Sequence, residues 1–144
     1  RRAADAVSTR LRHADGSLAR CARRGVVAES EAGLEDYASL ALAFIALHRV
    51  SDRAPASGRQ DLATAVALLE LAHERFHDAS GGKGYFDTRD QRADLFVRAR
   101  STYDGAIASG TSMMLDALDQ AHELTGEPMW RDRLLGALAA HSSS

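Results

Sequence analysis

The chain has 144 residues, of which 45% are hydrophobic and 26% charged, and a formal net charge of −2. These values are typical of one soluble globular unit, and neither sign of charge dominates, which argues against nucleic acid or a membrane as a partner. The single cysteine, Cys21, excludes an internal disulfide and a cysteine-based zinc site. A lone thiol fits a reducing compartment, so we expect a cytoplasmic protein, and no cofactor is expected. Because the chain starts Arg-Arg, we also expect it to be part of a longer protein.

The first half of the chain predicts an irregular lead-in followed by two helices. The turn signal Asp15-Gly16 interrupts the polar lead-in, where a short helix is expected within residues 1–14. The clearest helix runs from Leu34 to Val50, and from Leu40 to Leu47 it contains no polar side chain. A helix that is apolar all round is expected to be surrounded by protein.

A second, amphipathic helix is predicted from Asp61 to His77, after a loop at 51–59. Its apolar side chains fall on one face, whereas Asp61 is expected to face away from the core. Tyr85 to Thr88 and Leu95 to Arg98 alternate like short strands, and we expect them to pair as a small β-hairpin.

Two further helices are predicted in the last third of the chain. The first begins at Ser109 or Thr111 and ends at Leu124, and the second covers Met129 to Ala140. Gly126 and Pro128 lie between them, and glycine after a helix end with proline in the next first turn is a common stop and start signal.

A weak internal repeat connects the two halves of the chain. Leu47 to Asp52 aligns with Ala121 to Gly126, and each segment ends a buried helix that leads to an amphipathic one. Two copies of such a hairpin indicate an α/α toroid or solenoid. His48 and His122 occupy the same place in the two copies, and we expect them to form hydrogen bonds at helix ends rather than to act as catalysts.

The segment 95–112 is the main candidate for a functional loop. It is longer than an ordinary connection between helices, and such ordered loops are usually functional. It contains two arginines, a tyrosine, an aspartate and several serine and threonine residues. This composition is typical of the floor of a polar pocket.

Several motifs resemble the thioredoxin-domain-containing, spermatogenesis-associated protein family over roughly residues 10–140, in the order found in that family. The matching segments are Gly33-Leu34-Glu35-Asp36-Tyr37-Ala38, Phe76-His77-Asp78, Gly81-Gly82, Gly84-Tyr85-Phe86-Asp87-Thr88, Arg98, Tyr103-Asp104-Gly105-Ala106, Ser109-Gly110 and Ser112. The C-terminal part of that family resembles six-hairpin glycosidase-like and N-acylglucosamine 2-epimerase-like (α/α)6 barrels. The resemblance therefore implies that this chain is a piece of a larger toroid and is connected with carbohydrate metabolism.

The chain departs from the family pattern at three positions and in one whole domain. Family members have lysine where Arg100 stands, proline at Ala108 and asparagine at Thr111. Arginine keeps the charge but not the point-charge geometry of lysine. The thioredoxin domain is absent and no Cys-x-x-Cys motif is present, so a redox activity does not transfer to this chain.

These observations together predict an all-α fold of helical hairpins, arranged as a partial ring of the (α/α)-barrel type with a small β-hairpin insertion. The expected parts are a lead-in at 1–32, a first hairpin at 33–78, the β-hairpin and site loop at 79–108, and a second hairpin at 109–141, within one domain of residues 1–144. Too few helices are present to close a ring, so apolar helix faces should be exposed. We expect the remainder of the same polypeptide, or a second copy in a homo-oligomer, to cover them.

The first functional hypothesis is a sugar-processing domain, an isomerase or hydrolase. Hydrolysis of glycosides requires two carboxylates on either side of the bond, and Glu35, Asp36 and Asp104 are the candidates for acid and base. Within the barrel family, loops that enter the inner helices line the pocket. The candidate substrate-binding residues are Tyr37, Arg98, Arg100, Tyr103 and Ser109.

The alternative hypothesis is a non-catalytic helical scaffold or binding module. In that interpretation Glu35 and Asp36 stabilise the start of a helix, Asp104 pairs with Arg98 to brace the loop, and the hydroxyl of Ser109 caps the following helix. The two hypotheses differ in what Asp104→Asn should do, since it should remove activity in the first case and stability in the second.

One further motif, His73-Glu74-Arg75-Phe76-His77, has the H-E-x-x-H spacing of zinc proteases. Its context argues against catalysis, because Arg75 places a cation between the histidines and no third histidine follows at the expected spacing, and no metal site is therefore expected. Gly81-Gly82-Lys83-Gly84 is a turn rather than a phosphate-binding loop, because a helix precedes it and a strand follows it, the reverse of what a phosphate-binding loop requires.

Overall fold

The computed structural model describes residues 1–51, 55–89, 99–100 and 105–142. This part of the chain is mostly helical and contains one small β-hairpin, which confirms the predicted fold class. The elements are α1 (Arg2–Arg10), β1 (Ala22–Arg23), β2 (Val26–Val27), α2 (Leu34–Arg49), α3 (Pro55–Phe76), α4 (Gly110–Thr125) and α5 (Pro128–Ser142).

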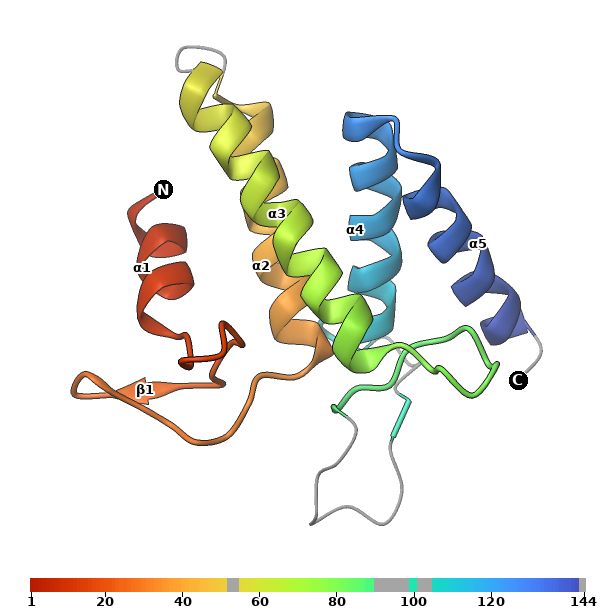
Figure 1. The fold of residues 1–144 in the computed structure, drawn as a ribbon, viewed down its shortest axis with the longest axis horizontal. Helices are drawn as coiled ribbons and strands as arrows, with labels where there is room; N and C mark the ends of the chain where they lie inside the picture. The colour runs from red at the N-terminus through yellow and green to blue at the C-terminus, as the bar shows by residue number, and fades with distance from the viewer. Residues whose placement is uncertain (52–54, 90–98, 101–104, 143–144) are drawn as a thin grey trace.

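The helices form two antiparallel hairpins that lie side by side (Figure 1). In the first hairpin α2 is followed by α3, and in the second α4 is followed by α5. Helix α2 packs against both α3 and α4, and α4 packs against α5, so α2 and α4 are the neighbouring central helices. Both begin at the same end of the molecule, at the bottom of Figure 1, and α3 ends there.

The two central helices run parallel and in register. Ser39 contacts the sulfur of Met113 at 3.7 Å, and the Nη2 of Arg49 donates to Glu123 Oε2 at 2.6 Å. Each pair is 74 residues apart in sequence, so the same offset holds along most of the contact.

The internal repeat is visible in the hydrogen bonds at the ends of these helices. Ser51 Oγ donates to the Leu47 carbonyl at 2.6 Å, and the equivalent Thr125 Oγ1 donates to Ala121 at 2.7 Å. His48 Nδ1 lies 2.8 Å from the carbonyl oxygen of Gly58, a residue of α3. The equivalent His122 Nδ1 lies 3.1 Å from that of Glu127, just before α5. Both histidines thus join a central helix to the next helix, as expected.

The core lies between the helices of the two hairpins and below α3. Its largest fully buried side chains are Trp130, Tyr37, Tyr85, Phe76, Leu34, Ile45, Leu68, Leu69, Met114 and Leu118. Tyr37 and Phe76 meet edge to face with ring centroids 5.5 Å apart. Such an arrangement is favoured by the charge distribution of aromatic rings.

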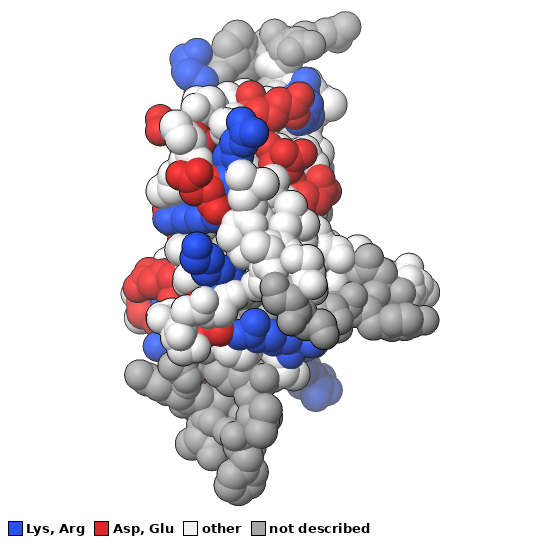
Figure 2. All heavy atoms as spheres, turned by 90° about the vertical axis from the view of Figure 1, so that its right-hand side faces the viewer, with Lys and Arg blue, Asp and Glu red and all other residues white. Residues whose placement is uncertain are grey.

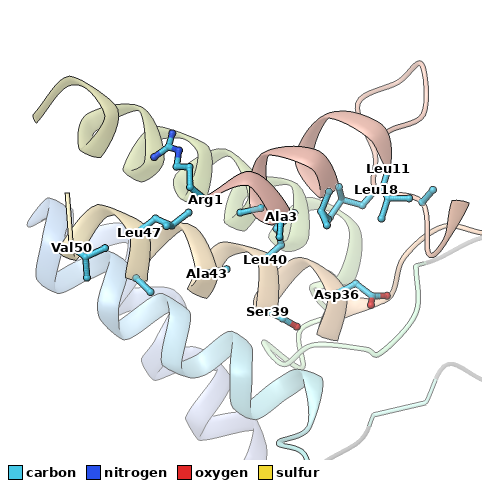
Figure 3. A pocket seen from close by; sticks show the side chains of 14 residues that line it. Arg1, Ala3, Leu11, Leu18, Asp36, Ser39, Leu40, Ala43, Leu47 and Val50 are labelled. Carbon is cyan, nitrogen blue, oxygen red and sulfur yellow. The ribbon is translucent and has the colours of Figure 1, made fainter. Parts of the chain in front are cut away.

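Two predictions about the polarity of the helices were wrong. Asp61 does not face solvent, because it is only 1% exposed and its Oδ2 accepts a hydrogen bond from Arg1. Helix α2 is not covered all round, since Ala43 and Ala46 are exposed. They open into an apolar groove of about 690 Å³ along α1 and α2, drawn in Figure 3.

The boundaries also differ from the predictions in two places. Helix α3 begins at Pro55, within the predicted loop at 51–59, because proline is well suited to the first position of a helix. The structure shows a β-hairpin in the lead-in, which the sequence analysis did not predict. Ala22 pairs with Val27 around Arg24 and Gly25, whose φ angles of 52° and 81° are those of a tight hairpin turn. The second strand predicted at 95–98 lies outside the described residues.

The surface carries both signs of charge. Figure 2 shows lysine and arginine side chains interspersed with aspartate and glutamate on the side of α5, with an uncharged area between them. Within the described residues, none of the helices has the length and apolar character required to cross a membrane.

Candidate functional site

A polar cavity lies where the N-termini of α2 and α4 meet. It encloses about 360 Å³. Its lining consists of Arg20, Gly33, Glu35, Asp87, Thr88, Ile107, Ala108, Ser109 and Gly110. The two central helices, α2 and α4, therefore bring the start of the first predicted hairpin next to the end of the predicted site loop.

Glycine at position 110 allows this close approach. A Cβ atom at Gly110 would lie 3.0 Å from the backbone nitrogen of Glu35 and 3.4 Å from its Cα. Gly33 is similarly close to another segment, since its Cβ would lie 3.1 Å from the Asp87 carbonyl oxygen. Both glycines therefore allow backbone to pack directly against backbone at the wall of the cavity.

Glu35 is the predicted catalytic residue that lies at this cavity. It projects from the first turn of α2, and its Oε1 accepts a hydrogen bond from Arg20 Nη2 at 3.2 Å. The two side chains are 50% and 58% exposed, so a ligand can reach both. A carboxylate and a guanidinium in one cavity can together bind hydroxyl groups, the first as acceptor and the second as donor.

Asp87 is a second acidic residue of the cavity, and the sequence analysis did not select it. Its backbone is fixed on both sides, because its carbonyl accepts from Leu34 N–H at 3.0 Å and its N–H donates to the Ala99 carbonyl at 2.9 Å. A signal was available, since Asp87 belongs to the Gly84–Thr88 segment that carries the family resemblance. Asp87 lies far from Glu35 in the sequence, so no local pattern indicated that the two residues line the same cavity.

Asp36 and Tyr37, two other predicted site residues, form part of the framework. Asp36 Oδ2 accepts a hydrogen bond from the Gly33 N–H at 2.8 Å, which fixes the start of α2. Tyr37 is fully buried, its hydroxyl accepts from Leu18 N–H at 2.8 Å, and burial raises the pKa of its hydroxyl. Its ring is therefore not available to stack on a sugar.

Ser109 lies at the cavity and also caps α4. Its Oγ accepts from the Ser112 N–H at 3.1 Å, which is the capping role proposed in the alternative interpretation. The side chain is buried, so its hydroxyl contributes to the cavity wall rather than to the open surface.

Arg100 lies away from the cavity, in a brace around the glycine-rich turn. Its guanidinium donates to Asp78 and lies 4.2 Å from the centre of the Phe86 ring. Hydrogen bonds from Ser80, and then the pairing with Arg100, lower the pKa of Asp78. A Cβ at Gly82 would lie 2.2 Å from Asp78 Oδ2, so the turn requires glycine to accommodate this pair.

The remaining predicted site residues, Arg98, Tyr103 and Asp104, lie outside the described residues. Arg98 falls in the undescribed range 90–98, and Tyr103 and Asp104 fall in the range 101–104.

The two histidines of the H-E-x-x-H motif stack on each other, with ring centroids 4.4 Å apart. His73 Nδ1 lies 2.9 Å from the hydroxyl of the buried Tyr85. Burial, together with the charge of Arg133 and the neighbouring His77, lowers the pKa of His73 to about 4. No cluster of three or more potential metal ligands occurs among the residues that the structure describes.

Comparison with known proteins gives one distant similarity. The chain is 29% identical over 109 residues to "Spermatogenesis-associated protein 20" of Rattus norvegicus and of Mus musculus. The aligned region covers 76% of this chain but only 13% of each relative, so the chain spans a small part of their length. No protein-family model and no solved structure matches the chain significantly. The similarity supports the spermatogenesis-associated family that the motifs indicated.

Proposed function

We propose that the chain is a sugar-processing domain, isomerase-like or hydrolase-like, whose substrate binds at the N-termini of α2 and α4. One observation carries this proposal, namely the polar cavity that contains Glu35, Asp87 and Arg20 beside two helix N-termini. Carboxylates that flank a sugar can act as acid and base, and helix N-termini favour negative charge that develops there. Asp104, with Arg98 and Tyr103 for substrate binding, completes the proposed set.

The parallel, in-register packing of α2 and α4 supports a toroidal arrangement. In such a ring the central helices run in the same direction and their entry loops meet at one end. The distant similarity to a much longer relative supports the further proposal that this chain is one section of a larger α/α barrel of the spermatogenesis-associated family. The proposed cytoplasmic location also remains part of this hypothesis.

The second candidate is a non-catalytic scaffold, and specific contacts favour it. Asp36, Tyr37, Ser109 and Arg100 were all selected as site residues, and all four make framework hydrogen bonds. In this interpretation the cavity is a structural gap between the two helix ends and binds no sugar.

A thermal-melt panel with monosaccharides and disaccharides, zinc and a chelator distinguishes these candidates. A sugar at a hundredfold excess over its Kd should stabilise the chain by about 2.7 kcal/mol, which raises the melting temperature by several degrees. Glu35→Gln should abolish that shift. Glu123→Gln is the matched control, because it removes an exposed carboxylate from the opposite end of the central helices. A sugar response that Glu35→Gln leaves intact contradicts the assigned site, and no response to any sugar supports the scaffold.

The apolar groove along α1 and α2 is the proposed contact surface for the remainder of the polypeptide or for a second copy. Its floor includes Leu40, Ala43 and Leu47 of α2. Light scattering at increasing protein concentration tests the second copy. A monodisperse and highly stable monomer would contradict the need for any cover.

A further inference from the structure

A second, smaller cavity lies on the other side of the α4 N-terminus, against the end of α5. It encloses about 260 Å³ and is lined by Ser109, Thr111, Ser112, Leu115, Leu138 and His141. Four of these residues carry hydroxyl or imidazole groups, and the two leucines supply an apolar wall. This cavity shares Ser109 with the proposed sugar site, but the inference about it does not require that a sugar binds there.

Two polar atoms at this cavity are buried and lack a partner. Thr111 is only 1% exposed, and its Oγ1 has no hydrogen-bond partner among the described residues. His141 Nε2 is also buried, and no partner for it occurs in the same part of the chain. A buried donor without a partner is unfavourable by roughly 1–3 kcal/mol relative to a satisfied one, so such atoms are uncommon in native proteins. Their presence together at one cavity indicates a group that would satisfy both.

The helix end adds further donors to the same place. Ser109 accepts from the Ser112 N–H, and its carbonyl accepts from the Met113 N–H. Among the described residues, no acceptor is found for the N–H groups of Gly110 and Thr111. Free N–H groups and the dipole at the start of a 16-residue helix favour an anion.

The composition of the wall selects among anions. Among the described residues that line this cavity none is a lysine or arginine, and His141 is the basic side chain in that set. A doubly charged phosphate would be poorly neutralised in such a site, whereas a carboxylate carries a single charge and accepts several hydrogen bonds. Leu115 and Leu138 can pack against a short aliphatic chain. We propose that this cavity binds the carboxylate of a small monocarboxylic acid between Thr111, His141 and the N-terminus of α4.

The proposal is tested with propionate, and with inorganic phosphate as the competing anion. Propionate at a hundredfold excess over its Kd should raise the melting temperature of the chain by several degrees and shift the backbone amide resonances of Gly110 and Thr111. Thr111→Val and His141→Phe should each weaken propionate binding at least tenfold. Thr64→Val is the matched control, because it removes a hydroxyl that donates to the Gln60 carbonyl on α3 and does not line the cavity.

Thr111→Val also separates binding from folding. Its hydroxyl has no hydrogen-bond partner among the described residues, so without propionate the variant should melt at the wild-type temperature or slightly above it. A propionate response that is equal in wild type and Thr111→Val overturns the proposal. The proposal is also overturned if propionate gives no response, because water alone would then fill the cavity. It is likewise overturned if phosphate binds more tightly than propionate.

Discussion

The close approach of α4 to α2 makes Gly110→Ala the most direct test of how the cavity is built. The added Cβ would lie 3.0 Å from the backbone nitrogen of Glu35 and 3.4 Å from its Cα and Cβ. These atoms belong to the first turn of α2 and cannot move away as the end of a flexible side chain can. The two helix ends must therefore separate, which widens the cavity between them.

The size of the effect follows from two opposing contributions. Overpacking of a close contact costs about 1–3 kcal/mol, whereas replacing glycine by alanine in a helix interior gains at most about 1 kcal/mol, and less in the first turn. We expect a net loss of about 1–2 kcal/mol. For a domain of this size, 1 kcal/mol corresponds to about 3 °C, so the melting temperature should fall by about 3–6 °C.

Thermal unfolding followed by circular dichroism measures this change, with Gly105→Ala as the matched control. No atom lies within 4 Å of a Cβ placed at Gly105, so that variant should melt within about 1 °C of wild type. If Gly110→Ala is as stable as wild type, the N-termini of α2 and α4 are not in direct contact, and the proposed cavity is not formed as described.

Three further predictions concern single side chains. The pKa of His73 is lowered to about 4, so the unfolded chain binds more protons than the folded chain between pH 6.5 and 4. The free energy of unfolding should therefore fall by about 1.5 kcal/mol from pH 6.5 to 5 in urea titrations, and much less in His73→Gln. Tyr37→Phe leaves the buried Leu18 N–H without its acceptor and should cost about 1–3 kcal/mol in the same assay, whereas a sugar-stacking role would leave stability unchanged. Arg49→Ala breaks an exposed ion pair with Glu123 and should change stability by less than about 1 kcal/mol, and a larger loss measured by thermal melting would contradict this assignment.

The sequence alone determined the features that depend on neighbours within one or two turns of a helix. The apolar spacing predicted the four long helices, and Ser109, Gly126 and Pro128 predicted where α4 begins and ends and where α5 begins. His48 and His122 form the predicted hydrogen bonds at helix ends because their partners follow within about ten residues. Helix signals and caps act locally, so the sequence carries them directly.

Only the tertiary structure decided which polar residues belong to a site and which support the fold. Tyr37 and Arg100 carry side chains suited to binding, yet Tyr37 bonds to the lead-in and Arg100 braces the turn at Asp78. Asp61 follows the polar pattern of a helix but is buried, and it pairs there with Arg1 at the far end of the sequence.

The tertiary structure also decided which residues line the polar cavity. Asp87 and Glu35 are 52 positions apart by their numbering, and they line one cavity because the segment after α3 returns to the start of α2, where the Leu34 N–H donates to the Asp87 carbonyl. Helix periodicity predicts which face of a helix is buried, but not which distant backbone will pack on it. That choice depends on contacts between hairpins, such as the approach of Gly110 to Glu35, for which a local pattern holds no information.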